Sequence, residues 1–363
     1  MTLVEFVPPE PHPLWKLCLQ MGITDVIVKV MDHDPEKVIA DLAAAGLRVV
    51  GFEGDMFDMS PIKEYREQGT GNGEQGTGNR DQAIEKYIKY LELMARHDIR
   101  LLCYNFMVGT GWARTGVREG RGGAKATYFS IKDAEEFKVQ SLKFKEDGGV
   151  ENLKPSTLNL KLTEEQVWAN YEYFIRAVMP TAERLGIRMG LHPDDPCLPS
   201  LGGYARIFGS VEAYDRAYAL YPSESNAVTF CQANFKLMGV DLEEAARHFG
   251  KRIAFIHVRD VEGTKEDFTE LFHDQGTTDQ FALMRTYREL GLDVPVRGDH
   301  VPEMEGDRIL TEDCVPGYFT MGRLFANGYL KALLKGTLPA VRGKYLDIGC
   351  IEKPDTGLLL MVR

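Results

Sequence analysis

The sequence has no apolar run that approaches the roughly 18 residues needed to cross a bilayer, and no secretory signal at its start. It has no C-x-x-C pair, its cysteines being scattered at positions 18, 103, 197, 231, 314 and 350. It also lacks a basic excess, and the net charge of -11 disfavours nucleic acid or an anionic membrane as main partner. We therefore expect a soluble protein of a reducing, cytoplasmic compartment.

Short runs of valine, isoleucine, leucine and phenylalanine alternate with helical patterns, which predicts a parallel sheet with crossover helices. The runs are nearly continuous in apolar residues, as in strands covered on both faces. Parallel α/β barrels range from about 200 to over 400 residues, so the length also fits. We predict a TIM (β/α)8 barrel, with residues 1–363 forming one domain. The predicted strands are Leu3–Val7, Asp25–Val30, Arg48–Glu53, Arg100–Phe106, Ile187–His192, Ala227–Cys231, Arg252–Val258 and Val294–Asp299.

Helical periodicity fills the intervals between these strands. Thr163 begins a T-E-E-Q capping-box pattern, and Asp241 is placed as a helix N-cap. The predicted helices are Pro35–Ala45, Asp81–His97, Thr163–Leu185, Val211–Leu220, Leu242–Phe249, Thr278–Leu290 and Tyr318–Leu334.

Two connecting segments exceed the usual loop of about 4 to 6 residues. The first, Asp55–Arg80, repeats EQGTGN at positions 67 and 74. We interpret it as a flexible loop, because its glycines do not directly join a strand to a helix as in a nucleotide site. The second, Met107–Leu162, follows a strand at the expected active-site face and is a candidate lid. Leu338–Arg363 is expected to be a tail on the barrel or on a partner subunit of a homo-oligomer.

Four consecutive predicted strands end on a side chain that can bind a metal, namely His192, Cys231, His257 and Asp299. Barrel strands converge at one rim, so these residues are expected to be neighbours. Two imidazoles, a thiolate and a carboxylate suit a divalent metal such as zinc, iron or manganese. Each alone could be a hydrogen-bonded histidine or a buried small side chain. Together the four endings favour a metal site.

Groups for proton transfer lie beside these strand ends. His300 follows Asp299 directly and could act as general acid or base. Tyr318, in PGYF, could bring a phenol to the same rim or be a packed aromatic residue.

An acidic protein needs local cations to hold an anionic substrate, and arginine binds a carboxylate through two parallel hydrogen bonds. Asp194 and Asp195 could orient His192, or could be turn and capping residues. The candidate cations are Arg114, Arg206, Arg259 and Arg297, each of which could also be an ordinary surface arginine.

Several motifs make the chain resemble the D-mannonate dehydratases of hexuronate breakdown. HPDDP, and CYNFM followed by W-x-R-T, are the most specific, and the resemblance covers most of the chain. The motifs are CYNFM with W-x-R-T at Cys103–Thr115, HPDDP at 192, the strand-end Cys231, FIHVRD at 255, RGDH at 297 and PGY at 316.

The resemblance implies a TIM barrel that converts D-mannonate to 2-keto-3-deoxy-D-gluconate. Asn105, Trp112 and Arg114 belong to the motifs and are implied substrate contacts, and His300 and Tyr318 are the implied catalytic pair. The metal is expected to be manganese or iron, with zinc or cobalt as alternatives, and to absorb charge as the C2 proton leaves. The implied ligands are His192, Cys231, His257 and Asp299.

The sequence also departs from the family pattern. Val301 and the acidic segment PEMEGD follow His300 in place of a glycine, and Gln232, Ala233 and Asn234 replace a run of small residues. Only Arg323 remains of the pattern that normally follows PGY. These changes suggest that the substrate is a related sugar acid.

Other functions are compatible with the same residues. A metal-dependent isomerase or epimerase of sugars or sugar acids would also pass through an enediol. A metal-dependent hydrolase is less favoured because a second metal cluster is not evident, and a non-catalytic sugar-acid sensor is favoured least.

Overall fold

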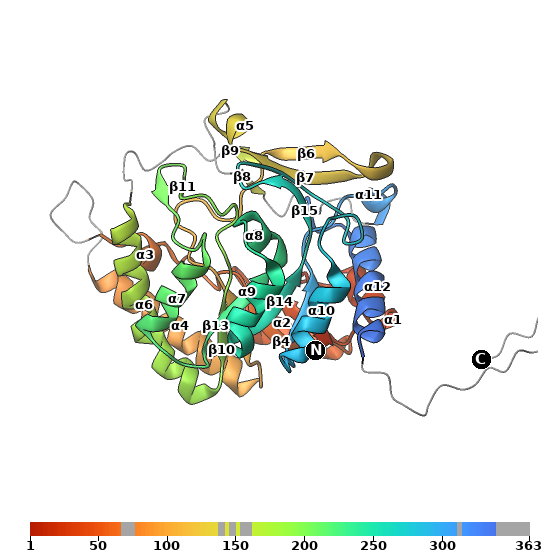
Figure 1. The fold of residues 1–363 in the computed structure, drawn as a ribbon. Coiled ribbons are helices and arrows are strands. Elements are labelled where there is room, and N and C mark those ends of the chain that lie inside the picture. Colours follow the sequence, from red (N-terminus) through yellow and green to blue (C-terminus); the bar gives the residue numbers. More distant parts are fainter. Residues whose placement is uncertain (67–76, 137–141, 145–149, 153–161, 311–313, 339–363) are drawn as a thin grey trace, which may run out of the picture.

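A parallel sheet of nine strands closes on itself at the centre of the molecule, in the order β1-β17-β14-β13-β10-β5-β4-β3-β2. The structure is a computed structural model that describes residues 1–66, 77–136, 142–144, 150–152, 162–310 and 314–338. β1 (Thr2–Leu3) pairs with β17, and β2 (Glu5–Val7) pairs with β3. Only Val4 separates β1 from β2, so one N-terminal segment closes the ring (Figure 1).

The strands of this ring confirm the predicted TIM barrel. All six residues of β13 and of β14 are buried, as expected for strands covered on both faces. The remaining strands are β3 (Asp25–Val28), β4 (Arg48–Glu53), β5 (Leu101–Tyr104), β10 (Arg188–Leu191), β13 (Asn226–Cys231), β14 (Ile253–Val258) and β17 (Pro295–Gly298).

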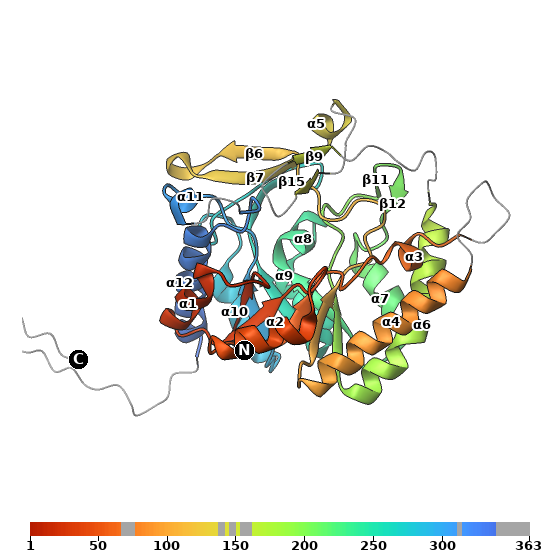
Figure 2. The same cartoon turned by 180° about the vertical axis from the view of Figure 1, so that it is seen from behind.

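Helices surround the barrel, as Figures 1 and 2 show from opposite sides. Those predicted from the sequence are α2 (Pro35–Ala44), α4 (Thr77–Arg96), α6 (Glu164–Leu185), α7 (Val211–Leu220), α9 (Leu242–Phe249), α10 (Gln280–Glu289) and α12 (Thr320–Gly336). Those not predicted are α1 (Pro13–Gln20), α3 (Ser60–Lys63), α5 (Ile131–Glu136), α8 (Gln232–Leu237) and α11 (Asp307–Leu310). Tyr318 lies two positions before α12, since Phe319 is the N-cap.

The predicted helix caps are confirmed. Thr163 and Gln166 form a reciprocal capping box at the start of α6. The side chain of Asp241 accepts a hydrogen bond from the Glu244 amide at the start of α9.

A second, antiparallel sheet lies over one end of the barrel in both views (Figures 1 and 2). Its order is β15-β16-β7-β6. β6 (Gly116–Glu119) and β7 (Lys125–Ser130) belong to the predicted Met107–Leu162 insertion. β15 (Val261–Thr264) and β16 (Asp267–Glu270) follow β14 and were not predicted. We call these strands the cover sheet.

Away from the carboxyl ends of the strands, buried apolar side chains fill the barrel interior. One buried cluster includes Val4, Ile27, Leu101 and Phe255. At Gly190 a Cβ atom would lie 2.6 Å from Thr229 Oγ1, so the residue at this position must be small. The predicted loop Asp55–Arg80 is in part helical, since Ser60–Lys63 form α3 and Thr77–Arg80 belong to α4. Residues 67–76 of that loop and the tail at 339–363 lie outside the described residues. Among the residues that are described, no helix is long and apolar enough to cross a membrane.

Candidate active site

His192, Cys231, His257 and Asp299 come together at the carboxyl ends of β10, β13, β14 and β17. One potential ligand atom from each lies within 4.8 Å of the others. Strand register produces this grouping, since Cys231 pairs with His257 across β13 and β14, and His257 pairs with Arg297 across β14 and β17. The four residues that the sequence predicted as metal ligands therefore lie together in the structure.

The protonation of the two imidazoles suits metal binding. Burial lowers the pKa of His192 to about 4 and also lowers the pKa of His257, so both rings are neutral near pH 7. His192 Nδ1 lies 2.8 Å from the Pro193 carbonyl oxygen, which leaves its Nε2 free to bind a metal. His257 is fully buried, and within the described residues neither of its nitrogens has a hydrogen-bond partner.

Asp299 and Cys231 add a carboxylate and a thiol to the two imidazoles, and together these four groups can bind a divalent metal. Burial alone would raise the pKa of Asp299, but His300 and Arg297 outweigh it and hold that pKa well below its usual range. Burial raises the pKa of the Cys231 thiol, whose sulfur donates to Asn234 Oδ1 at 2.9 Å. Metal binding would replace that thiol proton. A buried imidazole without a partner is costly, so the residues present fit a divalent metal.

His300 and Tyr318 face each other beside this cluster. His300 Nε2 lies 3.0 Å from Tyr318 Oη, and His300 is buried while Tyr318 is half-buried. The ring of Trp112 packs against His300 at a centroid distance of 4.6 Å. His300 has a left-handed backbone, with φ of 45°, which is uncommon for a residue other than glycine. The backbone is therefore held in a strained conformation at the predicted catalytic histidine.

Glu270, at the end of β16 in the cover sheet, is a site residue that the sequence analysis did not identify. Its Oε1 lies 2.8 Å from His300 Nδ1. Arg259 Nη1 is also near this nitrogen, at 3.1 Å. The carboxylate can only accept, so the shorter contact places the proton on Nδ1 and leaves Nε2 facing Tyr318. Burial alone would raise the pKa of Glu270, but Arg114 and His300 lower it to about 2.

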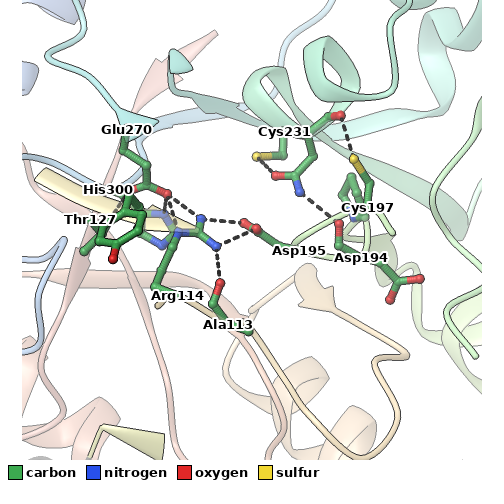
Figure 3. A network of polar contacts seen from close by, with 12 residues as sticks. Ala113, Arg114, Thr127, Asp194, Asp195, Cys197, Cys231, Glu270 and His300 are labelled. Atoms are coloured by element: carbon green, nitrogen blue, oxygen red, sulfur yellow. Dashed lines mark hydrogen bonds and ion pairs between the residues drawn. The ribbon is translucent and has the colours of Figure 1, made fainter. Parts of the chain in front are cut away.

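A buried ion-pair network supports this histidine (Figure 3). Arg114 lies between Glu270 and Asp195, and donates to both oxygens of Asp195 at 2.7 and 3.0 Å. Arg259 Nη1 donates to Asp195 at 2.9 Å and to Asp299 at 3.2 Å. Arg259 Nε and Nη2 are buried without a hydrogen-bond partner among the described residues. This network therefore connects the cover sheet to Asp299 of the four-residue cluster.

The other predicted site residues lie around the same rim. Arg206 donates to the Thr110 and Gly111 carbonyl oxygens at 2.7 and 2.9 Å. Asn105 Oδ1 accepts from Lys63 at 3.1 Å. Asp194 accepts from the Phe208 amide at 2.7 Å, so it holds the loop after β10. Within the part of the chain that the structure describes, no hydrogen bond joins Asp194 to the His192 ring.

The segments that depart from the family pattern lie beside the candidate metal ligand Cys231 and against the cover sheet. Gln232 and Asn234 are fully buried on α8, and Gln232 contacts Tyr287 on α10 at 3.2 Å. Glu303, in the acidic segment after His300, exchanges backbone hydrogen bonds with Lys125 of β7 at 2.9 and 2.8 Å. The acidic segment is thus fastened to the cover sheet, and Tyr318 still reaches His300.

A TIM barrel with a cluster that could hold a metal ion and a histidine–tyrosine pair at its carboxyl rim has the architecture of many barrel enzymes. Residues 20–342 match the model of one family, described as D-mannonate dehydratase (UxuA). The chain belongs to the D-mannonate dehydratase family, and it is accordingly a lyase of the hydro-lyase type.

Individual relatives agree with this assignment. Mannonate dehydratase 1 of Bacillus licheniformis is 31% identical over 268 residues, covering 69% of this chain and 72% of the relative. The crystal structure of mannonate dehydratase from Streptococcus suis serotype 2 superposes with a TM-score of 0.75 at 25% identity, covering 93% of this chain and 95% of that one. An L-ribulose 3-epimerase structure, at 12% identity and a TM-score of 0.54, covers 98% of this chain and all of its own, and shares the fold.

Proposed function

We propose that this protein is a metal-dependent dehydratase that removes water from a sugar acid, with D-mannonate as the first candidate substrate and 2-keto-3-deoxy-D-gluconate as its product. The observation that carries the proposal is the His300–Tyr318 contact of 3.0 Å directly beside the four-residue cluster. Membership of the mannonate dehydratase family supports the same reaction.

His192, Cys231, His257 and Asp299 would hold the metal. Manganese or iron is proposed, and zinc or cobalt would accept the same donors. When bound, the metal supplies a Lewis acid that makes the proton on C2, next to the carboxylate, easier to remove.

His300 and Tyr318 would carry out the proton transfers. Dehydration needs a base that takes the C2 proton and an acid that protonates the leaving hydroxyl at C3. The Glu270 contact leaves His300 Nε2 as an acceptor toward the Tyr318 hydroxyl, and burial raises the pKa of Tyr318, so the phenol stays protonated. This pair can therefore offer one basic and one acidic group to neighbouring carbons.

Arg259 is the proposed anchor for the substrate carboxylate, because its Nε and Nη2 are buried without a partner among the described residues. Asn105, Trp112 and Arg206 are proposed further substrate contacts. Arg114 and Arg297 lie at the same site but already bind carboxylates of the chain. We propose that these two arginines do not contact the substrate but hold those carboxylates in position at the site.

A panel of aldonic acids tests the reaction. Each acid is incubated with the Mn²⁺-loaded protein and assayed for 2-keto-3-deoxy acids. We expect product from D-mannonate or from a close epimer, since Tyr318 reaches His300 despite the changed segment between them. The absence of product from every acid in the panel would refute the dehydratase proposal.

A further inference from the structure

His257 lies between two carboxylates. Its Nδ1 is 3.8 Å from Asp299 Oδ2, and its Nε2 is 3.6 Å from Glu53 Oε2. Glu53 is the last residue of β4 and lies across the barrel mouth from β14. Both contacts exceed hydrogen-bond length, so the buried ring stands between two acceptors without bonding either.

Arg297 fixes the position of Glu53. Its Nη2 donates to Glu53 Oε1 at 2.5 Å, and its Nε donates to Glu53 Oε2 at 3.1 Å. The same Nη2 lies 2.8 Å from Asp299 Oδ1. One arginine thus holds both carboxylates that flank His257.

We propose that Glu53 is a positioning residue of the metal centre. When a metal is bound, its carboxylate would accept the N–H of the His257 nitrogen that faces away from Asp299, and so direct the other nitrogen to the metal. A histidine ligand usually donates its second N–H to such an acceptor, which fixes the tautomer and the ring orientation. The inference rests on the proposed metal centre but assigns a role that is independent of the substrate.

A second possible metal site shares Glu53 and His257 with the arrangement just described. Glu53, Cys103 and His257 also bring ligand atoms within 4.8 Å of one another, so Glu53 could itself be a ligand. Two observations favour the positioning role. Arg297 already engages both oxygens of Glu53, and Cys103 Sγ accepts a hydrogen bond from Thr229 at 3.4 Å.

Co²⁺ titration of the metal-free protein distinguishes these roles, because cobalt absorbs visibly and shows a charge-transfer band when bound to a thiolate. We expect E53Q to bind one equivalent with the wild-type spectrum but about 10- to 100-fold more weakly. C103S should bind as wild type does. E262Q, which changes an exposed glutamate of β15, is the matched control and should also be unchanged.

Wild-type affinity in E53Q would overturn the positioning role. Loss of Co²⁺ binding in C103S would instead indicate that Glu53, Cys103 and His257 bind the metal. Should E53Q fail to fold, E53D keeps the charge beside Arg297 but shortens the side chain, and the same weakening is expected. Absence of Co²⁺ binding by the wild type would instead refute the metal centre itself.

Discussion

His300 is the residue on which the proposed chemistry depends most. Glu270 and Tyr318 bind its two nitrogens, at 2.8 and 3.0 Å. We predict that His300→Asn keeps bound metal and fold but lowers kcat by roughly 10² to 10⁴, the usual contribution of a general acid or base. Metal analysis and steady-state kinetics measure the two effects. His248→Asn, on the exposed face of α9, is the control, and normal turnover of His300→Asn would exclude the assignment.

A separate prediction concerns the proposed metal ligands. Cys231→Ser and His257→Ala should each lower the bound metal, because each removes one of four donors and leaves the others to bind alone. Metal content after dialysis against a weak chelator measures this, with His248→Ala as a matched control. Full occupancy in both variants would contradict the ligand set.

Most of the candidate ligands could be predicted from the sequence because they lie at the ends of buried strands. His192, Cys231 and Asp299 each end a predicted strand and His257 is the penultimate residue of another, and Arg48–Glu53 ends on Glu53 in the same way. The sequence therefore also carried a signal for Glu53. Glu270 had no such signal, because it lies in an antiparallel strand whose pairing with β7 joins segments about 140 residues apart.

At the scale of elements, the cover sheet is the feature that most affects the site. Phe268 of β16 is fully buried and stacks on Phe129 of β7 at a centroid distance of 6.0 Å. We predict that Phe268→Ala lowers the free energy of unfolding by about 3 to 5 kcal/mol. It should also lower turnover, because β16 carries Glu270, while metal content stays unchanged.

Chemical denaturation and kinetics measure these two effects of Phe268→Ala. Phe281→Ala, on α10, removes a ring that is 45% exposed and should change both quantities little. Full activity in a destabilised Phe268→Ala protein would mean that the cover sheet does not position Glu270.

The barrel strands were predictable and the cover sheet was not, for a physical reason. Strands such as β13 and β14 are buried on both faces and therefore appear as continuous apolar runs. β15 is buried only at Val261, so its four residues resemble a loop. The helix α1 did carry a signal, since Pro13 occupies its first turn and His12 caps it, but it is short.

At the scale of the whole molecule, buried histidines should lower the free energy of unfolding at acidic pH. Burial lowers the pKa of His273, which is 2% exposed, from 6.5 to about 4. Above pH 6.5 the ring is neutral in both states and contributes nothing to the pH dependence. As the pH falls from 6.5 to 4, only the unfolded chain takes up the proton, so the free energy of unfolding decreases by about 3 kcal/mol from this residue.

Urea denaturation of the metal-free protein across this pH range tests the effect. His273→Leu should show a shallower decrease than the wild type. Identical slopes for the two proteins would contradict the assignment of this acid sensitivity to His273.

The central claim is that the barrel removes water from a sugar acid, and proton NMR of the metal-loaded protein with D-mannonate in D₂O tests it most directly. Dehydration predicts loss of the C2 proton and a 2-keto-3-deoxy product that carries one solvent deuterium at C3. Deuterium at C2 of an otherwise intact aldonate would indicate an epimerase and contradict the account, as would an unchanged spectrum.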